Sequence, residues 1–436
     1  MSRLARDAIV ALDRKHVWHP YTSLDTWERT DPIVVARAEG AWLEDVDGRR
    51  YLDANSSWWV ASLGHGHPRL VKVLAEQAKE LAHVALAGIT HEPAAALAKD
   101  LVDVAPDGLE HVFFTDNGST AIEVAIKIAV QLWHNEGRPA KKRFVALDGA
   151  FHGETIGATS LGGVEVFRKP FAGVLFDCFY APFPEDDAYE RAFEAMADFL
   201  RREKDTVAAV VVEPLVQGAA GMRMYPPEYL KRLREVTAAN DVLLIVDEVF
   251  TGYGRTGAMW ACEHAGITPD VMCLGKAFAS ILPMAAAMVT DRVHDAFRGG
   301  KDKTLWYGHT FCGHPLGAAV AREVLAIYRD EDVVGQARRK APRIAASFDR
   351  LAKKKGVARV RTLGMIGAAD LTGGVQGDQG YLGDLGWRVY DEARKRGAYL
   401  RPLGDTIYVC PPLTIPDADL DALLRIVEES VDAVIS

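Results

Sequence analysis

Cysteine is scarce in this chain, and the few cysteines form no pattern. Only five occur among 436 residues, at positions Cys178, Cys262, Cys273, Cys312 and Cys410. An odd number of scattered cysteines in apolar surroundings excludes a disulfide framework and a zinc site built on paired cysteines. These residues are therefore expected to be reduced, as in a cytoplasmic protein.

Long apolar runs, internal repeats and an excess of positive charge are also missing. The longest apolar stretches, such as residues 207–212, are far too short to span a bilayer. Residues 1–15 mix charges with apolar side chains, unlike a signal peptide. With 51 Lys and Arg against 60 Asp and Glu, the net charge is −9. Neither a membrane nor nucleic acid is therefore expected as a main partner.

The composition is that of a globular protein large enough for more than one domain, with 49% hydrophobic and 25% charged residues. From about residue 95 to 325, apolar strand-like runs alternate with helical patterns. This alternation is typical of an α/β domain with a mostly parallel sheet. Strands are expected at 111–115, 143–147, 207–213, 242–247 and 271–274, and helices at 119–134, 189–202 and 227–240.

The two ends of the chain show other patterns. Residues 42–52 predict a hairpin that turns at Asp47-Gly48, followed by a helix from Pro68 to about Ala82. The C-terminal hundred residues predict strands at 361–370 and 406–410 and helices at 385–396 and 417–434. Three parts are expected: an N-terminal segment (1–66) that packs with the small domain, a large domain (67–328) and a C-terminal small domain (329–436).

Two residues at expected strand ends suggest the chemistry. Asp247 ends one buried strand, and Lys276 follows the next, with Gly275 between. The carboxyl ends of parallel strands are where α/β folds bind ligands. An amine and a carboxylate placed there suit pyridoxal phosphate, which needs a lysine for its Schiff base and an acid for its pyridine nitrogen. Taken singly, the acid could cap a helix and the lysine could be a surface residue.

Residues 116–120, with the sequence DNGST, follow a strand and open a helix. Gly118 lets the backbone approach a ligand closely, and the first N–H groups of the helix, including that of Ser119, are free to bind an anion. The alternative is that Ser119 or Thr120 only caps the helix. Together with Asp247 and Lys276, a phosphate site here completes three separate requirements of one cofactor.

Further side chains allow a role in a site or an ordinary structural one. Glu213, at a strand end, could lie near the cofactor ring or face solvent. Arg401, between apolar residues, could bind a carboxylate through both nitrogens or form a common ion pair. Adjacent tryptophans point to opposite sides of an extended backbone, so Trp58 and Trp59 are expected to divide between core and pocket.

Two other motifs carry little weight. The sequence His65-Gly66-His67 has two metal-binding side chains, but no third ligand lies nearby, so no metal is expected. The glycines of residues 252–257 match a dinucleotide-binding pattern, which would indicate an oxidoreductase. No helix pattern of the required kind follows them. A third alternative is a regulator that binds a cofactor without catalysis, but nothing in the sequence suggests a DNA-binding module, and Lys276 is present.

Taken together, four segments resemble the class III, fold-type I aminotransferases that use pyridoxal 5'-phosphate: residues 116–127, 211–222, 243–257 and 271–277. The likeness extends over essentially the whole chain. It implies an α/β fold with a mostly parallel central sheet in a large domain and a smaller α+β domain. It also implies a homodimer with shared active sites.

Four more segments resemble the members of this family that act in biotin synthesis: residues 16–22, 56–68, 307–317 and 399–412. This likeness implies transfer of an amino group from S-adenosylmethionine to 8-amino-7-oxononanoate, which gives 7,8-diaminononanoate. The alternatives are lysine as the donor, or the reaction of another ω-amino acid or diamine aminotransferase.

The resemblance also implies roles for particular residues. Lys276 and Asp247 are the catalytic pair, with Lys276 bound to the cofactor and Asp247 at its pyridine nitrogen. Further cofactor contacts fall to Gly118, Ser119, Phe151, His152 and Glu213, and to His309 and Thr310 from a partner subunit. Substrate contacts fall to Tyr21, Trp58, Trp59, Phe151, Gly308 and Arg401. The chain departs from the family in having Phe151 where tyrosine is usual and Glu154 where aspartate is usual.

Overall fold

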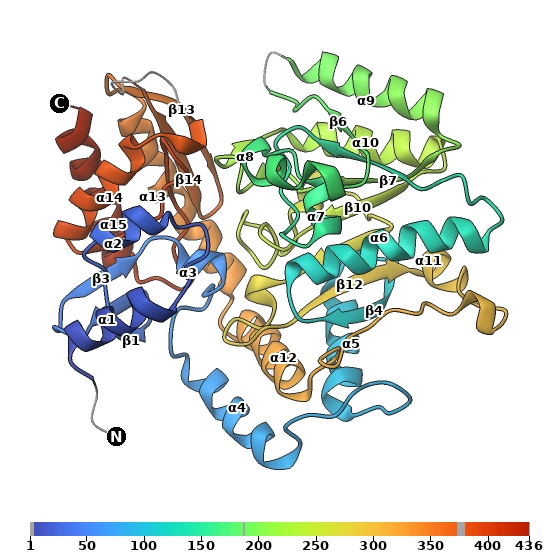
Figure 1. Ribbon diagram of the computed structural model, residues 1–436, viewed down its shortest axis with the longest axis horizontal. Coiled ribbons are helices and arrows are strands. Elements are labelled where there is room, and N and C mark those ends of the chain that lie inside the picture. Colours follow the sequence, from blue (N-terminus) through green and yellow to red (C-terminus); the bar gives the residue numbers. More distant parts are fainter. Residues whose placement is uncertain (1–3, 186–187, 373–379, 436) are drawn as a thin grey trace.

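The computed structural model of the chain describes residues 4–185, 188–372 and 380–435. Four sheets are present among these residues, and Figure 1 shows the largest on one side of the molecule and two smaller ones on the other. The large sheet has seven strands in the order β4-β12-β11-β10-β7-β5-β6. Their bounds are β4 Leu109–Thr115, β5 Arg143–Leu147, β6 Cys178–Ala181, β7 Val207–Val212, β10 Leu243–Asp247, β11 Val271–Leu274 and β12 Ala285–Thr290.

Only β12 runs antiparallel to its neighbours, β4 and β11, in this sheet. The strands β11, β10, β7, β5 and β6 pair in parallel, so the predicted α/β class with a mostly parallel sheet is confirmed. The strand β12 lies outside every predicted range, although its run of alanines is short and buried. Parallel pairing brings the carboxyl ends of β7, β10 and β11 to one edge.

Helices cover both faces of the large sheet, which explains the continuous apolar runs of its strands. Along β10, Leu243 and Ile245 pack with α6 on one face, whereas Leu244 and Val246 pack with α10 on the other. The helices of this region are α5 Glu92–Val104, α6 Gly118–Asn135, α7 Ile156–Leu161, α8 Glu165–Arg168, α9 Tyr189–Glu203, α10 Pro227–Ala239 and α11 Asp291–Asp295. The short strands β8 Val216–Gln217 and β9 Arg223–Met224 form a separate pair.

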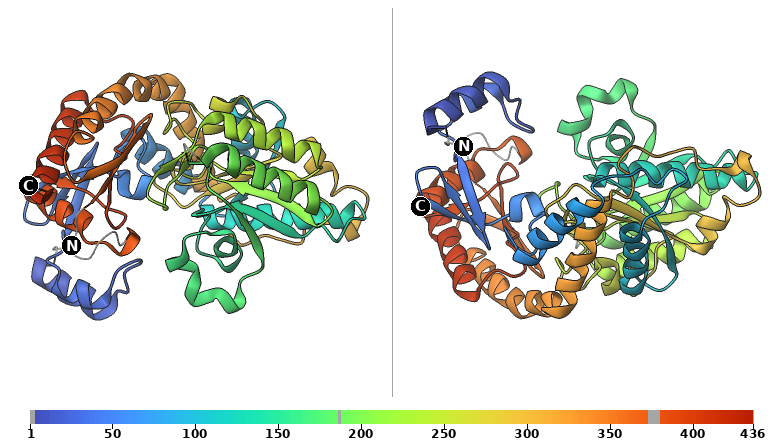
Figure 2. Two further views of the ribbon diagram at one scale, coloured as in Figure 1. Left: turned by 90° about the horizontal axis from the view of Figure 1, so that it is seen from above. Right: turned by 90° about the horizontal axis from the view of Figure 1, so that it is seen from below.

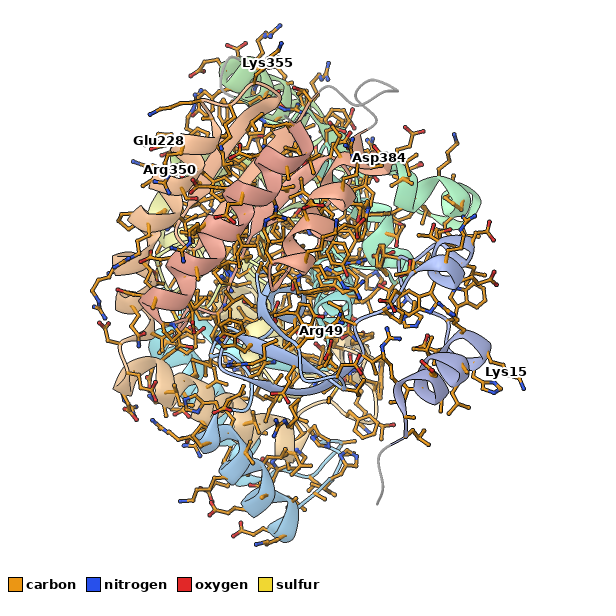
Figure 3. All side chains as sticks on the ribbon, turned by 90° about the vertical axis from the view of Figure 1, so that its left-hand side faces the viewer. Lys15, Arg49, Glu228, Arg350, Lys355 and Asp384 are labelled. Carbon is orange, nitrogen blue, oxygen red and sulfur yellow. The ribbon has the colours of Figure 1, made fainter. Side chains whose placement is uncertain are left out.

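The two ends of the chain meet in the smaller sheets. The N-terminal strands β1 Val35–Glu39, β2 Trp42–Asp45 and β3 Arg50–Asp53 form a sheet with the C-terminal β15 Ala398–Tyr399. A three-stranded sheet is made of β13 Val357–Leu363, β14 Ile366–Leu371 and β16 Thr406–Val409. The helices α13 Val333–Leu351, α14 Leu385–Lys395 and α15 Asp417–Ile435 flank it. Charged side chains such as Arg350, Lys355 and Asp384 project from this side (Figure 3).

The remaining helices connect these parts. They are α1 Arg6–His16, α2 Leu24–Arg29, α3 Ser56–Trp59, α4 Pro68–Glu80 and α12 Pro315–Asp330. Among the described residues, no helix is both long enough and apolar enough to cross a membrane. The division at residues 66/67 and 328/329 stays a prediction.

Most of the expected elements lie where the sequence placed them, including the hairpin at Asp47-Gly48 between β2 and β3. One prediction is wrong: residues 361–370 are not a single strand. The chain reverses at Gly364, which has a φ of +56°, and β13 and β14 form a hairpin. A Cβ at this glycine would lie 2.4 Å from the carbonyl carbon of Thr256, so the turn is packed against the large domain.

Candidate active site

A cavity of about 680 Å³ opens at the carboxyl ends of the parallel strands. Its size is in the usual range for a small-molecule site. The structure brings nine of the predicted residues together in its lining: Trp58, Trp59, Gly118, Ser119, Phe151, His152, Glu213, Asp247 and Lys276. They come from segments that are up to 218 positions apart in the sequence, since the first is Trp58 and the last Lys276.

The carboxylate of Asp247, at the end of β10, is buried and held in one orientation. Its Oδ2 lies 2.8 Å from Nδ1 of His152, and its Oδ1 accepts the N–H of Val249 at 3.1 Å. His152 is itself buried, and its Nε2 has no hydrogen-bond partner among the described residues. The bond to Val249 stabilises a local turn, as a capping acid would. The buried contact between Asp247 and His152 is additional, so Asp247 does more than cap a helix.

Lys276 follows β11 and points its amine into the cavity. Its Nζ lies 4.8 Å from the ring centroid of Trp59 and 5.9 Å from that of Phe250. Burial lowers the pKa of this amine, while the carboxylates of Asp247 and Glu213 oppose the shift. A lowered pKa favours the neutral, nucleophilic amine. The alternative of a solvated surface lysine is therefore wrong.

The backbone of Lys276 is also unusual, with a φ of +50°. A left-handed conformation costs a non-glycine residue about 1–2 kcal/mol. Such strained positions concentrate at functional sites, where the surrounding structure holds them.

The N-terminus of α6 borders the cavity, and Asn117 caps it. Oδ1 of Asn117 accepts the N–H of Thr120 at 3.0 Å, and Oγ1 of Thr120 accepts the N–H of Asn117 at 3.2 Å. Neither Ser119 nor Thr120 is the N-cap residue, so that alternative is corrected. The N–H groups of Gly118 and Ser119 are the first two of the helix and have no carbonyl partner within it. Free N–H groups at the start of a helix are suited to an anion.

Packing within the protein already requires a glycine at position 118. A Cβ at this position would lie 2.7 Å from Cγ1 of Val249, which is closer than real contacts. The side chain of Ser119 accepts the N–H of Glu154 at 3.1 Å, and so links α6 to the loop after β5.

Glu213 is buried behind Phe151, so the solvent-facing alternative is wrong. Its carboxylate accepts the N–H of Phe151 at 3.0 Å and the N–H of Gly218 at 2.9 Å. Burial raises the pKa of Glu213 to about 7; His152 opposes the shift and Asp247 adds to it. The carboxylate of Glu213 therefore fixes the backbone of Phe151 through its N–H group.

Trp58 and Trp59 both line the cavity, but their backbone is not extended as predicted. Residues Ser56, Ser57, Trp58 and Trp59 have φ values of +52°, +48°, +64° and +73°, which form a left-handed turn. Side chains of consecutive residues in a turn do not alternate between two faces. Trp59 is buried, and its ring centroid lies 4.5 Å from that of Phe250, whereas Trp58 is half-buried.

Two predicted substrate residues, Tyr21 and Arg401, lie at the mouth of the cavity and touch Trp58. The guanidinium of Arg401 lies 4.8 Å from the ring centroid of Trp58, and the ring of Tyr21 lies 5.4 Å from it. The hydroxyl of Tyr21 donates to Oε1 of Glu154, whose pKa is raised by burial. The N-terminal helices and the α7–α8 segment project on the same side of the molecule (Figure 2).

The mouth contains two aromatic residues that the sequence analysis missed, Phe167 and Tyr381. The ring of Phe167 makes edge contacts with Tyr21 at 5.4 Å, Phe151 at 5.9 Å and Tyr381 at 4.9 Å. They come from α8 and from a 3₁₀ segment, Gly380–Leu382. No periodicity or motif connects these short elements, so only the tertiary structure could find them.

Like Tyr21 and Arg401, the predicted residues Gly308, His309 and Thr310 lie outside the cavity lining itself. Gly308 and Thr310 are exposed, and Nε2 of His309 lies 3.5 Å from Oδ1 of Asp116, which does line the cavity. A contribution of these residues to the site of a partner subunit stays a prediction.

The residues of the cavity fit pyridoxal 5'-phosphate. The cofactor needs an amine, a carboxylate for its ring nitrogen, an anion site for its phosphate and an apolar face for its ring. Lys276, Asp247, the start of α6 and Phe151 supply one each. The unpartnered Nε2 of His152 is a buried polar atom that a ligand could satisfy.

Comparisons with known proteins give the same result. The family described as aminotransferase class-III matches residues 24–431. The chain is 40% identical over 438 residues to the adenosylmethionine-8-amino-7-oxononanoate aminotransferase of Geobacter sulfurreducens, with 97% of each chain covered.

Two solved structures are similar over nearly the whole chain. The adenosylmethionine-8-amino-7-oxononanoate aminotransferase from Methanocaldococcus jannaschii has a TM-score of 0.95 and 32% identity, covering 99% of this chain and 100% of that one. A PLP-bound amine transaminase from an uncultivated Pseudomonas species has a TM-score of 0.90 and 31% identity, covering 96% and 99%. The chain therefore belongs to the class-III aminotransferase family and is an aminotransferase that depends on pyridoxal phosphate.

Proposed function

We propose that this enzyme transfers an amino group from S-adenosylmethionine to 8-amino-7-oxononanoate, giving 7,8-diaminononanoate in biotin synthesis. The likeness to relatives of that name supports the reaction. The observation that carries the proposal is the pairing of a half-buried lysine at the cavity floor with an arginine over a tryptophan at its mouth. This arrangement suits a long substrate with a reacting carbon at one end and a carboxylate at the other.

The proposed chemistry places Lys276 and Asp247 at the reacting centre. When bound, pyridoxal phosphate supplies an aldehyde that condenses with amines and a ring that takes up negative charge. In the donor half-reaction, Nζ of Lys276 accepts a proton from the substrate carbon. In the second half-reaction, Nζ donates a proton to the corresponding carbon of the keto acid. The carboxylate of Asp247 holds the proton at the ring nitrogen, and His152 fixes the orientation of that carboxylate.

The cofactor is proposed to lie between α6 and the loop after β5. The N–H groups of Gly118 and Ser119 bind its phosphate, and Phe151 covers its ring. Glu213 holds the backbone of Phe151 through the N–H group and so keeps the ring in place. The presence of each of these groups in the cavity lining supports these assignments.

The substrate wall is proposed to consist of Trp58, Trp59 and Tyr21, with Arg401 as its cation. Aromatic side chains suit both a long aliphatic chain and a cationic sulfonium donor, which they attract through cation–π contact. Arg401 forms no ion pair with a carboxylate among residues 4–185, 188–372 and 380–435, so its two outer nitrogens can bind a substrate carboxylate.

A homodimer with shared active sites is part of the proposal, as is a cytoplasmic location. The loop that contains Gly308, His309 and Thr310 also carries two exposed large apolar side chains. Trp306 is 79% exposed and Phe311 is 50% exposed. Clustered apolar side chains at a surface favour burial against a partner. The partner's Gly308 would then border the substrate, and the partner's His309 and the partner's Thr310 would approach the phosphate.

The choice of amino donor can be tested directly. Purified holoenzyme is mixed with S-adenosylmethionine, lysine or a diamine, and the absorbance of the bound cofactor is followed in a single turnover. We expect S-adenosylmethionine to convert the cofactor to its amine form, and 8-amino-7-oxononanoate to reverse the change. Conversion with lysine or with the diamine, but not with S-adenosylmethionine, would refute the proposed reaction. So would a converted cofactor that 8-amino-7-oxononanoate does not change back.

A further inference from the structure

Four consecutive residues of the cavity wall have backbone conformations that side chains disfavour. Ser56, Ser57, Trp58 and Trp59 all have positive φ, and none is glycine. In this conformation the Cβ atom crowds the following carbonyl oxygen, so single residues adopt it rarely and runs hardly ever. A run of four persists only where the surrounding structure holds it. The side chains that hold this turn therefore control where both tryptophans lie.

The buried carboxylate of Asp53 hydrogen-bonds to the turn and to Asn55, the residue directly before it. Its Oδ2 accepts the N–H of Ser57 at 2.7 Å, and its Oδ1 accepts the N–H of Asn55 at 3.2 Å. The side chain of Asn55 in turn accepts the N–H of Trp58 at 3.1 Å. Hydrogen bonds to a charged, buried acceptor are about twice as strong as neutral ones. Asp53 is thus placed to stabilise a turn that the sequence itself disfavours.

His65 completes this contact from the other side. Its Nε2 lies 2.9 Å from Oδ2 of Asp53. Its backbone is fixed by a two-way bridge to Gly40, with N–H to carbonyl distances of 2.8 and 2.9 Å. His65, the first histidine of the His65-Gly66-His67 motif, therefore contacts the same carboxylate that hydrogen-bonds to the turn.

The turn is also tied to the C-terminal segment that carries Arg401. The hydroxyl of Ser56 donates to the carbonyl of Cys410 at 2.7 Å, and the N–H of Cys410 donates to the carbonyl of Ala54 at 2.6 Å. The N–H of Ala54 donates to the carbonyl of Tyr399, two residues before Arg401. The position of Trp58 relative to Arg401 thus depends on the turn.

We propose that Asp53, supported by His65, is a positioning residue that holds the left-handed turn and thereby sets Trp58 beneath Arg401 and Trp59 beside Lys276. Neither Asp53 nor His65 lines the cavity, so both act through the tryptophans. Loosening the turn should weaken binding of a long substrate more than the proton transfers at Lys276. The identity of that substrate rests on the proposed function.

Four holoenzymes test the inference: wild type, Asp53→Asn, Ser57→Gly and the double variant. Asparagine keeps the shape of Asp53 but loses its charge, and its amide cannot serve all three donors. Ser57 is exposed and has a φ of +48°, so glycine removes the conformational penalty without removing a packed side chain. Glycine at 57 should therefore offset the loss of the carboxylate.

We expect Asp53→Asn to raise the KM for 8-amino-7-oxononanoate about 10-fold and to change kcat less than about 3-fold. Its near-ultraviolet circular dichroism should differ from wild type, because two tryptophans move. Ser57→Gly alone should resemble wild type, and the double variant should recover most of the KM and the spectrum. A purely structural role would lower the melting temperature without this split between KM and kcat.

An unchanged KM and spectrum in Asp53→Asn, or a double variant as impaired as Asp53→Asn, would overturn the inference. Should Asp53→Asn not fold, His65→Gln serves instead, with an expected KM increase of roughly 3-fold and the same consequence if nothing changes. A wild-type enzyme that does not use the keto acid would refute the proposed function. The circular dichroism series would then still decide the role of Asp53.

Discussion

The floor and the mouth of the cavity are built in different ways. The floor consists of Glu213, Asp247 and Lys276, which follow the neighbouring strands β7, β10 and β11 of one sheet. The mouth consists of aromatic and charged side chains from six separate segments of the chain: Tyr21, Trp58, Glu154, Phe167, Tyr381 and Arg401. In the floor, Glu213 and Asp247 are buried and Lys276 is half-buried, whereas the mouth residues are partly exposed.

This difference separates two tasks of the site. Burial lowers the pKa of Lys276, which favours the neutral amine that the proposed chemistry needs, and raises that of Glu213 to about 7. The mouth offers ring faces and one guanidinium, which select a substrate by shape and charge. We therefore expect changes in the floor to abolish chemistry, and changes in the mouth to alter substrate preference.

Removal of the floor amine should have the largest effect. We expect Lys276→Ala to lower kcat at least about 10⁴-fold, because no other amine in the lining can transfer the proton. Steady-state assays of the holoenzyme measure this. Lys127→Ala, which removes an exposed lysine from α6, is the matched control and should stay near wild type. A loss below about 10-fold in Lys276→Ala would contradict the expectation that the floor carries the chemistry and the mouth does not.

Neutralising the floor carboxylate should have the next largest effect. Asp247→Asn is expected to lower kcat about 10²- to 10³-fold, because a buried charge that stabilises a protonated ring nitrogen is lost. Single-turnover rates and the cofactor spectrum give the measurement. Asp148→Asn is a suitable control, since Asp148 also follows a strand of this sheet, β5, but is exposed. Similar rates for the two variants would argue against a special role for Asp247.

The mouth should respond differently. We expect Arg401→Ala to raise the KM for the keto acid about 10- to 100-fold, because the charge-assisted hydrogen bonds to its carboxylate are lost. The donor half-reaction should change less than about 3-fold, as single-turnover kinetics with each substrate can show. Arg388→Ala, an exposed arginine on α14, is the control. Equal losses in both half-reactions would remove Arg401 from this role.

A smaller effect, on stability alone, is expected next to the floor. Burial raises the pKa of Glu248 to about 7 from an ordinary value of 4.5, although Thr251 and Cys262 donate to its carboxylate. Between these pH values the folded protein keeps a proton that the unfolded chain releases. The free energy of unfolding should therefore fall as the pH rises from about 5 to 7.5.

In Glu248→Gln we expect this fall to be smaller by about 2 kcal/mol. Urea unfolding of the cofactor-free protein at several pH values measures it. Glu263→Gln, at a nearby exposed position, should leave the pH dependence as in wild type. An unchanged slope in Glu248→Gln would show that Glu248 does not carry the proton.

The two regions also differ in how far the sequence predicts them. Asp247 and Lys276 end apolar runs that burial on both faces of a sheet produces, so their shared edge follows from the strand order. Arg401 and Tyr21 were assigned by family resemblance, and both lie at the mouth. Phe167 and Tyr381 were missed because they lie in short irregular elements that only tertiary packing brings together.

Two local predictions of backbone structure were wrong, each for a physical reason. The extended backbone predicted for Trp58 and Trp59 is overridden by Asp53 and Asn55, whose side chains hold a left-handed turn. The single strand predicted at 361–370 is divided at Gly364, where the backbone has a positive φ and packs against residue 256. The first error comes from hydrogen bonds to side chains nearby in the sequence, and the second from a contact with a distant segment.

The most direct test of the central claim is to find which lysine carries the cofactor. The holoenzyme is reduced with borohydride, digested, and its peptides are weighed by mass spectrometry. We predict that the added mass lies on Lys276. Lys141 is the sharpest comparison, since burial lowers its pKa to about 8, but its amine donates to the carbonyls of Lys204 and Asp241 away from the cavity. Label on Lys141, or on any lysine other than Lys276, would contradict the account.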